Sequence, residues 1–196
     1  NYLNYQKLKN LNMFTFLQII FFFQKKKKYF RKNSKVKIIN FYSKTKIFAE
    51  KKIRNNKNNL VIRTNFTGFK KNNLKATFIG WILYNLRKKK KIKLFNDMYT
   101  STIDVDTLST IIIKLIKLNS KGIYNVAANG CINKKDFALK FSKLIKKQLL
   151  YKEISLNQFK VKRGFYLCLN VKKVEKKLGF KMIGINKVIN NLSKQI

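Results

Sequence analysis

Short strand-like segments alternate with longer helical patterns along this chain, and this alternation restricts the fold more than any other feature. The segments Leu60–Thr64 (LVIRT), Ile92–Phe95 (IKLF) and 123–127 (IYNVA) are short and rich in β-branched or aromatic residues, as strands are. Strands that alternate with helices predict an α/β chain built on a mostly parallel sheet. The helical patterns cover residues 42–54, 74–87, 105–118, 134–147 and 171–178.

Polar and glycine residues mark the ends of two of these helices. Asn133 precedes the helix predicted from residue 134, and Asn170 precedes the one predicted from residue 171. Asparagine is a favoured cap because its side chain accepts a hydrogen bond from a free backbone N–H. Gly179 follows the second helix, where a left-handed backbone conformation often ends a helix.

The most apolar run of the chain is FTFLQIIFFF at residues 14–23. It has about half of the ~20 residues that are needed to cross a bilayer. We interpret it as a buried strand, with a membrane anchor as the alternative. No secretory cleavage pattern is visible, and we expect a cytoplasmic protein without a membrane partner.

The charge of the chain is extreme, with 46 Lys and Arg against 7 Asp and Glu, a net charge of +39. Such a charge usually indicates a nucleic-acid or anionic-membrane partner. Proline and histidine are absent, however, and Lys, Asn, Ile, Phe and Tyr, which have A/T-rich codons, fill the chain, so the charge has in part a mutational origin. Arginine is the residue that suits phosphate and base recognition, and its scarcity argues against nucleic acid as a partner. The arginines are Arg31, Arg54, Arg63, Arg87 and Arg163.

The residue types that are missing exclude several kinds of site. Without histidine the chain can form neither a His-based catalytic triad nor a zinc site that needs imidazole. Cys131 and Cys168 are too few and too far apart in sequence for a disulfide framework or a Cys-x-x-Cys centre. We therefore predict two small, buried, apolar cysteines and no metal.

Tyr42 and Lys46 form a Tyr-x-x-x-Lys pair within the first predicted helix. Four residues are about one helical turn, so both side chains project from the same face. A nearby cation lowers the pKa of a phenol from its usual ~10, which suits a group that gives a proton to a carbonyl oxygen during reduction. In a chain so rich in Tyr and Lys, a surface pair without a function is the alternative.

The segments around this pair resemble, in their order and spacing, the extended short-chain dehydrogenase/reductases that act on nucleotide sugars. NFYSKTKIFAEKKI resembles the Tyr-x-x-x-Lys helix of that group, and VIRTNFTGF resembles its Arg-Thr-Asn-Phe-Phe-Gly strand end. The likeness continues through FIGWILYNLRKKKKIKLFND, TSTIDVDTLSTIIIKLI, GIYNVAANGCINKKDFALKF and VKRGFYLCLNVKKVEKKLGF. It covers roughly residues 36–196 and is strongest to the dTDP-4-dehydrorhamnose reductase-like sugar reductases.

The resemblance implies a role for each residue of the site. Tyr42 would be the catalytic acid/base, and Lys46 would lower its pKa while binding the nicotinamide ribose of NAD or NADP. Asn65 and Phe66 would line the junction of cofactor and substrate. Arg63 lies in the same segment. For this residue, a structural role as an ion-pair partner is an equal alternative to a role in the site.

The resemblance also implies a nucleotide-sugar substrate. Lys162 and Arg163 resemble a Lys-Arg-Pro segment that lies near the nucleotide diphosphate in such proteins, although Gly164 stands here in place of the proline. The helix over 42–54 corresponds to one that often forms dimer faces in related reductases, so a homodimer is a further expectation.

The chain departs from the family pattern in its first part. No G-x-x-G-x-x-G turn, which would hold the cofactor pyrophosphate, occurs in it, so we expect a fragment. Residues 1–66 would be the remaining half of a Rossmann-type nucleotide domain. Residues 67–196 would be mainly a small α/β substrate lobe, with 103–127 returning to the Rossmann sheet.

A frameshift is our hypothesis for residues 1–23. The family has Ser-Thr-Asp-Tyr-x-Phe where residues 18–23 read QIIFFF, which puts Ile19 at a hydroxyl position. Residues 14–22 can be encoded by a base sequence that, when read from its third base, specifies Tyr-Ile-Ser-Thr-Asp-Tyr-Ile-Phe. On this hypothesis, residues 1 to about 23 are translated out of frame.

These observations predict a fragment of a NAD(P)-dependent sugar-nucleotide reductase that transfers hydride to a keto sugar and is inactive as this chain. The alternatives are a sugar-nucleotide epimerase or dehydratase, a degenerate enzyme kept as a structural subunit, and a basic protein that binds RNA or a membrane surface.

Overall fold

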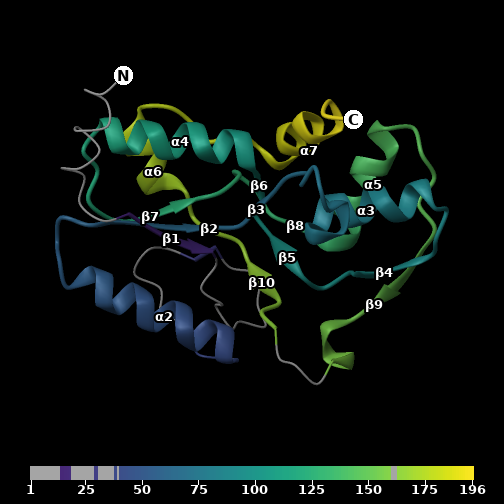
Figure 1. Ribbon diagram of the computed structural model, residues 1–196, viewed down its shortest axis with the longest axis horizontal. Coiled ribbons are helices and arrows are strands. Elements are labelled where there is room, and N and C mark those ends of the chain that lie inside the picture. Colours follow the sequence, from purple (N-terminus) through teal and green to yellow (C-terminus); the bar gives the residue numbers. More distant parts are fainter. Residues whose placement is uncertain (1–13, 19–28, 31–37, 39, 160–162) are drawn as a thin grey trace.

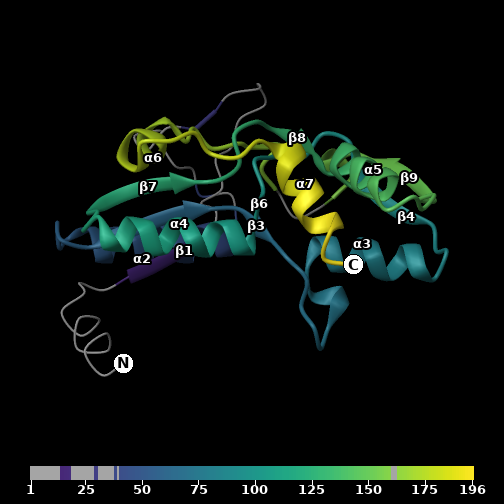
Figure 2. The ribbon, with the colours of Figure 1, turned by 90° about the horizontal axis from the view of Figure 1, so that it is seen from above.

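The computed structural model describes residues 14–18, 29–30, 38, 40–159 and 163–196, and it has two α/β lobes. In the first lobe, helix α2 covers one face of a sheet of β1, β2 and β7, and α4 and α6 cover the other face (Figure 1). Figure 2 shows the second lobe beside the first along the long axis of the molecule, with α7 near the junction. The fold is α/β with a parallel sheet, as the alternation of elements predicts, and the sheet is of the Rossmann type that the resemblance implies.

The sheet of the first lobe is parallel throughout, in the order β1-β2-β7. All five residues of β2 are buried, since helices cover both faces of the sheet. The predicted strand at 123–127 lies one residue earlier, and the apolar run at 14–23 forms a strand over its first five residues, while 19–23 lie outside the described residues. The strands are β1 (Phe14–Gln18), β2 (Leu60–Thr64) and β7 (Gly122–Val126).

Alternate residues of β2 face opposite helices, as the two-residue period of a strand requires. Leu60 and Ile62 belong to the core beneath α4 and α6, whereas Val61 packs with Ile53 of α2. Arg63 is therefore on the α2 side of the sheet. The helices of this lobe are α2 (Phe41–Arg54), α4 (Val105–Lys117) and α6 (Lys172–Leu178).

The second lobe has its own core between helices and short strands. Ile82, Phe137, Phe141 and Val188 are fully or almost fully buried in it. The chain enters and leaves this lobe several times, and the pair β3 (Phe66–Thr67) and β6 (Ile103–Asp104) lies at the junction. Its elements are η1 (Leu74–Ala76), α3 (Phe78–Arg87), β4 (Ile92–Phe95), β5 (Tyr99–Thr100), β8 (Ile132–Asn133), α5 (Lys134–Leu144), β9 (Tyr151–Ile154), η2 (Leu156–Gln158), β10 (Tyr166–Leu167) and α7 (Ile185–Ser193).

The ends of the predicted helices follow local hydrogen bonds. Asn133 caps α5 by accepting a hydrogen bond from the backbone N–H of Asp136, at 2.7 Å. Gly179 ends α6 with a φ of 77°. The pattern over 74–87 is divided into η1 and α3, because Thr77 is extended and its hydroxyl caps α3. In the part of the chain that the structure describes, no helix has the length and apolar character needed to cross a membrane.

The prediction for the cysteines was wrong for their pairing and for Cys131, which is only half-buried. Cys131 and Cys168 form a disulfide, with their Cα atoms 5.7 Å apart, although Cys168 is buried as predicted. Sequence separation concealed their proximity. In β5, Thr100 pairs with Ile132 on one side and with Leu167 on the other. Cys131, which precedes Ile132, and Cys168, which follows Leu167, therefore both lie beside Ser101.

Candidate active site

The candidate site lies where the carboxyl ends of β2 and β7 face the second lobe. Helix α2 precedes β2 and runs antiparallel to it. The amino end of α2 therefore lies beside the carboxyl end of β2 (Figure 1). Parallel α/β sheets bind ligands at the carboxyl ends of their strands.

The first turn of α2 is fixed by a capping box. The Asn40 side chain accepts a hydrogen bond from the Ser43 backbone N–H at 2.8 Å, and the Ser43 hydroxyl accepts one from the Asn40 N–H at 3.1 Å. Reciprocal caps of this kind satisfy backbone donors that have no partner within the helix. Tyr42 is therefore held in a defined turn of the helix.

Tyr42 and Lys46 lie on one face of α2, as their spacing predicts. The Lys46 Nζ atom is 5.4 Å from the centroid of the Tyr42 ring, within the range of a cation–π contact. Tyr42 is 39% exposed, so a substrate can reach its phenol.

Burial raises the pKa of Tyr42 above its ordinary value of 10, because desolvation disfavours the phenolate. The resemblance implies the opposite direction, namely that Lys46 lowers the pKa of Tyr42. The phenol is consequently protonated at neutral pH, and in this state it can donate a proton but cannot accept one.

A buried ion pair joins α2 to β2. Arg63 donates two hydrogen bonds to the Glu50 carboxylate, from Nε to Oε2 at 2.8 Å and from a terminal nitrogen to Oε1 at 2.7 Å. Both side chains are almost completely buried, at 3% and 5% exposure. Of the two interpretations of Arg63, the structural ion pair is the one that the structure contains.

This ion pair fixes the position of Tyr42 along the direction of β2. Tyr42 precedes Glu50 by two helical turns, or ~12 Å at ~1.5 Å per residue. The same length along β2, at ~3.3 Å per residue, reaches from Arg63 to about Phe66. Tyr42 is thus level with the residues that follow β2.

Asn65 and Phe66 follow β2 directly and have different surroundings. Asn65 is buried, and its carbonyl accepts a hydrogen bond from the Ile103 N–H at 2.8 Å. Phe66 is half-buried against the core of the first lobe. Asn65 therefore lies at the carboxyl end of the strand that Arg63 ties to α2.

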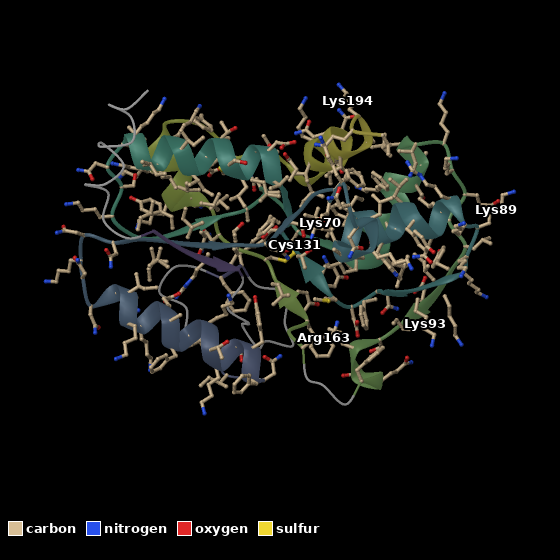
Figure 3. All side chains as sticks on the ribbon, viewed as in Figure 1. Lys70, Lys89, Lys93, Cys131, Arg163 and Lys194 are labelled. Carbon is tan, nitrogen blue, oxygen red and sulfur yellow. A yellow bond between two sulfur atoms is a disulfide. The ribbon has the colours of Figure 1, made fainter. Side chains whose placement is uncertain are left out.

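Of the predicted diphosphate residues, Lys162 lies outside the described residues. Arg163 is exposed, and its guanidinium carbon is 6.0 Å from the centroid of the Phe95 ring. Phe95 also makes an edge-to-face contact with Phe159, with the ring centroids 5.2 Å apart. Figure 3 shows Arg163 near the base of β10, between α2 and the second lobe in that view.

Sequence reasoning missed Glu50, which positions the site, and the unusual surroundings of Lys134. Glu50 follows Lys46 by four residues and is one of only 7 acidic residues in the chain, and these two signals could have identified it as a partner for Arg63. Burial lowers the pKa of Lys134 to about 8, and its Nζ atom is 4.2 Å from the centroid of the Phe78 ring. No pattern in a sequence with this many lysines distinguishes Lys134.

The fold and the site define an α/β protein of the Rossmann type with a Tyr/Lys pair at the carboxyl edge of its sheet. Residues 18–195 match the model of the RmlD substrate binding domain, and the chain belongs to this family. A search of curated proteins gives no significant match.

Solved structures of sugar-nucleotide enzymes share the fold. A dTDP-4-dehydrorhamnose reductase from Bacillus anthracis in complex with NADP has a TM-score of 0.82 and 20% identity, over 93% of this chain and 65% of that one. The dTDP-4-dehydrorhamnose reductase from Yersinia enterocolitica has a TM-score of 0.80 and 17% identity, over 95% and 68%. A dTDP-glucose 4,6-dehydratase from Bacillus anthracis in complex with NAD has a TM-score of 0.71 and 14% identity, over 89% and 58%. The chain thus spans 65% of the length of the first of these enzymes.

The first prediction concerns the ion pair. Arg63→Met leaves a buried carboxylate without its partner and should lower the free energy of unfolding by ~3–5 kcal/mol in urea titrations. Arg54 serves as a matched control, since its side chain is 57% exposed and its guanidinium lies 3.8 Å from the same carboxylate. Arg54→Met should cost less than ~1 kcal/mol. Equal losses in the two variants would contradict the proposed role of the ion pair in fixing α2.

The second prediction concerns the ionisation of Tyr42. The difference in phenolate absorbance between the wild type and Tyr42→Phe should titrate with a midpoint above pH ~10, which is the midpoint of a free tyrosine. Because the pKa in the folded state is raised, the stability that this burial contributes is complete below pH ~10 and is lost as the pH rises through the folded pKa. A difference spectrum with its midpoint below 10 would show instead that Lys46 controls the ionisation.

Proposed function

We propose that this chain carries the proton-donating and substrate-binding part of a sugar-nucleotide reductase that reduces a 4-keto sugar. The observation that carries the proposal is the Tyr42–Lys46 pair at the carboxyl edge of the sheet, in a chain that belongs to the RmlD substrate binding family. A protonated phenol beside a cation is the arrangement that a carbonyl reduction needs. An epimerase or dehydratase would need the same pair, so the choice of reduction rests on the family.

The residues present fit one end of a nicotinamide cofactor. Lys46 and Asn65 lie at the carboxyl edge of the sheet, where they would hold the nicotinamide ribose of NAD or NADP. None of the 7 glycines has the G-x-x-G-x-x-G spacing, so these 196 residues offer no such cradle for the pyrophosphate. The cofactor, when bound, supplies the hydride.

Each residue of the site then has a task that its chemistry allows. The Tyr42 hydroxyl gives its proton to the sugar carbonyl oxygen, and the Lys46 cation stabilises the phenolate that remains. Asn65 and Phe66, level with Tyr42, would contact the sugar. Lys162 and Arg163 would bind the diphosphate through charge-assisted hydrogen bonds.

We further propose that the 196 residues alone do not catalyse this reaction. Misplacement of reacting groups by ~1 Å can cost ~100-fold in rate, and the pyrophosphate cradle that would place the nicotinamide does not occur in the sequence. Ile19 stands where the family has a hydroxyl, and the loss of one donor to a developing oxyanion typically costs ~3 kcal/mol. The nucleotide sequence of the gene tests the frameshift hypothesis directly.

Two preparations test the proposed function. One is the 196-residue chain, and the other has the shifted frame repaired and a family-type glycine-rich segment added before it. We expect turnover of a dTDP-4-keto sugar with NADPH only in the second preparation. There, Tyr42→Phe should lower kcat by ~10²–10⁴, because the proton donor is lost. Tyr84→Phe is the control, since Tyr84 belongs to α3, where its ring contacts Lys75.

Other outcomes of this experiment distinguish the alternatives. Activity in the 196-residue chain that disappears in Tyr42→Phe would refute inactivity and support the site. Inactivity of both preparations together with tight, salt-dependent RNA binding would favour the basic-protein alternative. In Figure 3, Lys89 and Lys93 lie at the right of the view and Lys194 at its top, so these three lysines project from different elements.

We also propose a homodimer through the outer side of α2. Phe41 and Phe48 are two helical turns apart and therefore on one side of the helix, where they are 79% and 63% exposed. Exposed aromatic side chains that share one side of a helix can form an interaction surface.

Light scattering with size exclusion tests the dimer. The wild type should have twice the mass of one chain at micromolar concentration, and Phe41→Ser combined with Phe48→Ser should shift it to the mass of one chain. The matched control is Ile113→Ser, since Ile113 is 52% exposed on α4, on the other face of the sheet. A monomeric wild type would contradict the proposal.

A further inference from the structure

The disulfide between Cys131 and Cys168 lies where the chain passes between the two lobes. Cys131 follows the passage from β7 of the first lobe and directly precedes β8 of the second. Cys168 directly follows β10 of the second lobe and precedes the passage to α6 of the first. The bond therefore joins two separate lobe-to-lobe passages to each other.

Ser101 joins the same two passages without a covalent bond. Its carbonyl accepts a hydrogen bond from the Ala128 N–H at 3.1 Å, and its hydroxyl accepts one from the Leu169 N–H at 2.9 Å. Ser101 is fully buried. Reduction of the disulfide would leave the junction with these weaker links.

The passage at Cys168 also contacts the chain that leads to α2. Phe30 donates a backbone hydrogen bond to the Cys168 carbonyl at 2.9 Å, and its own carbonyl accepts one from the Asn170 N–H at 2.9 Å. The Asn125 side chain donates to the same Phe30 carbonyl at 2.9 Å. Breaking the disulfide at Cys168 would therefore affect segments of both lobes.

We propose that Cys131 and Cys168 form a reversible redox lock on the junction between the lobes. The oxidised pair fixes the two passages against each other, and the reduced pair lets them separate and the lobes move. This inference does not depend on the proposed function, since it concerns the coupling of two lobes whatever they bind.

The two cysteines differ in access, and this difference orders the chemistry. Cys131 is half-buried, whereas Cys168 is 2% exposed. A small-molecule disulfide such as oxidised glutathione would exchange first with the Cys131 thiolate, releasing one glutathione thiol. The Cys168 thiolate then attacks the Cys131 sulfur of the mixed disulfide and releases the second. Two cysteine thiols thus lose two protons and two electrons, and one glutathione disulfide becomes two thiols.

Hydrogen exchange on the full chain tests the lock. Protein equilibrated with oxidised glutathione or with dithiothreitol is first assayed for free thiols by alkylation and mass spectrometry. We expect no free thiol in the first sample and two in the second. The amides of Phe30, Ala128, Leu169 and Asn170 should exchange about tenfold faster or more in the reduced protein, because local opening becomes easier.

Two variants separate a lock from a merely structural bond. Cys131→Ser should exchange at the reduced rate in both buffers, and it is the safer variant because Cys168 is the more buried partner. Ser101→Ala should speed exchange more in the reduced protein than in the oxidised one, since the disulfide no longer joins the two passages that Ser101 also connects. Two free thiols after equilibration with oxidised glutathione, or equal exchange in the two redox states, would overturn the proposal.

Discussion

The buried pair of Glu50 and Arg63 is the interaction on which the candidate site depends. Removing two charges from water is costly, and the two short hydrogen bonds between Arg63 and Glu50 help to offset that cost. Any sliding of α2 along β2 would break both bonds and leave each charge buried without its partner. The ion pair therefore fixes the helix in one position, and with it the distance of Tyr42 and Lys46 from the end of the strand.

Three of the other acidic residues, in a chain with a net charge of +39, accept hydrogen bonds from backbone N–H groups. Asp104 caps α4 by accepting from the Thr107 N–H at 2.9 Å, and buried Glu175 accepts from the Met182 N–H at 2.9 Å. Asp97 accepts from the Leu156 N–H at 3.0 Å, which ties the end of β4 to η2. Carboxylates thus lie where a backbone donor or a guanidinium needs them. Most of the lysine excess is solvated surface, which is why so high a charge is compatible with a packed α/β fold.

The success of sequence reasoning followed the range of the interactions. The starts of α5 and α2 could be predicted closely, since caps such as Asn133 act within three residues. Helix α7 was missed: Ile185, Val188, Ile189 and Leu192 have helical spacing, but Gly184 offers no side-chain cap to mark its start. Strands of two residues, such as β5 and β10, are too short for any period to be recognised.

The sequence by itself determined the alternation of strands and helices, the one-turn spacing of Tyr42 and Lys46, and the resemblance to sugar-nucleotide reductases. Each of these depends on neighbours along the chain or on patterns of residue types. Only the tertiary structure decided that Arg63 binds Glu50, that burial raises the pKa of Tyr42, and that Cys131 meets Cys168 across β5. Pairing and burial depend on which elements pack together, and residues that are 37 positions apart carry no local signal of their contact.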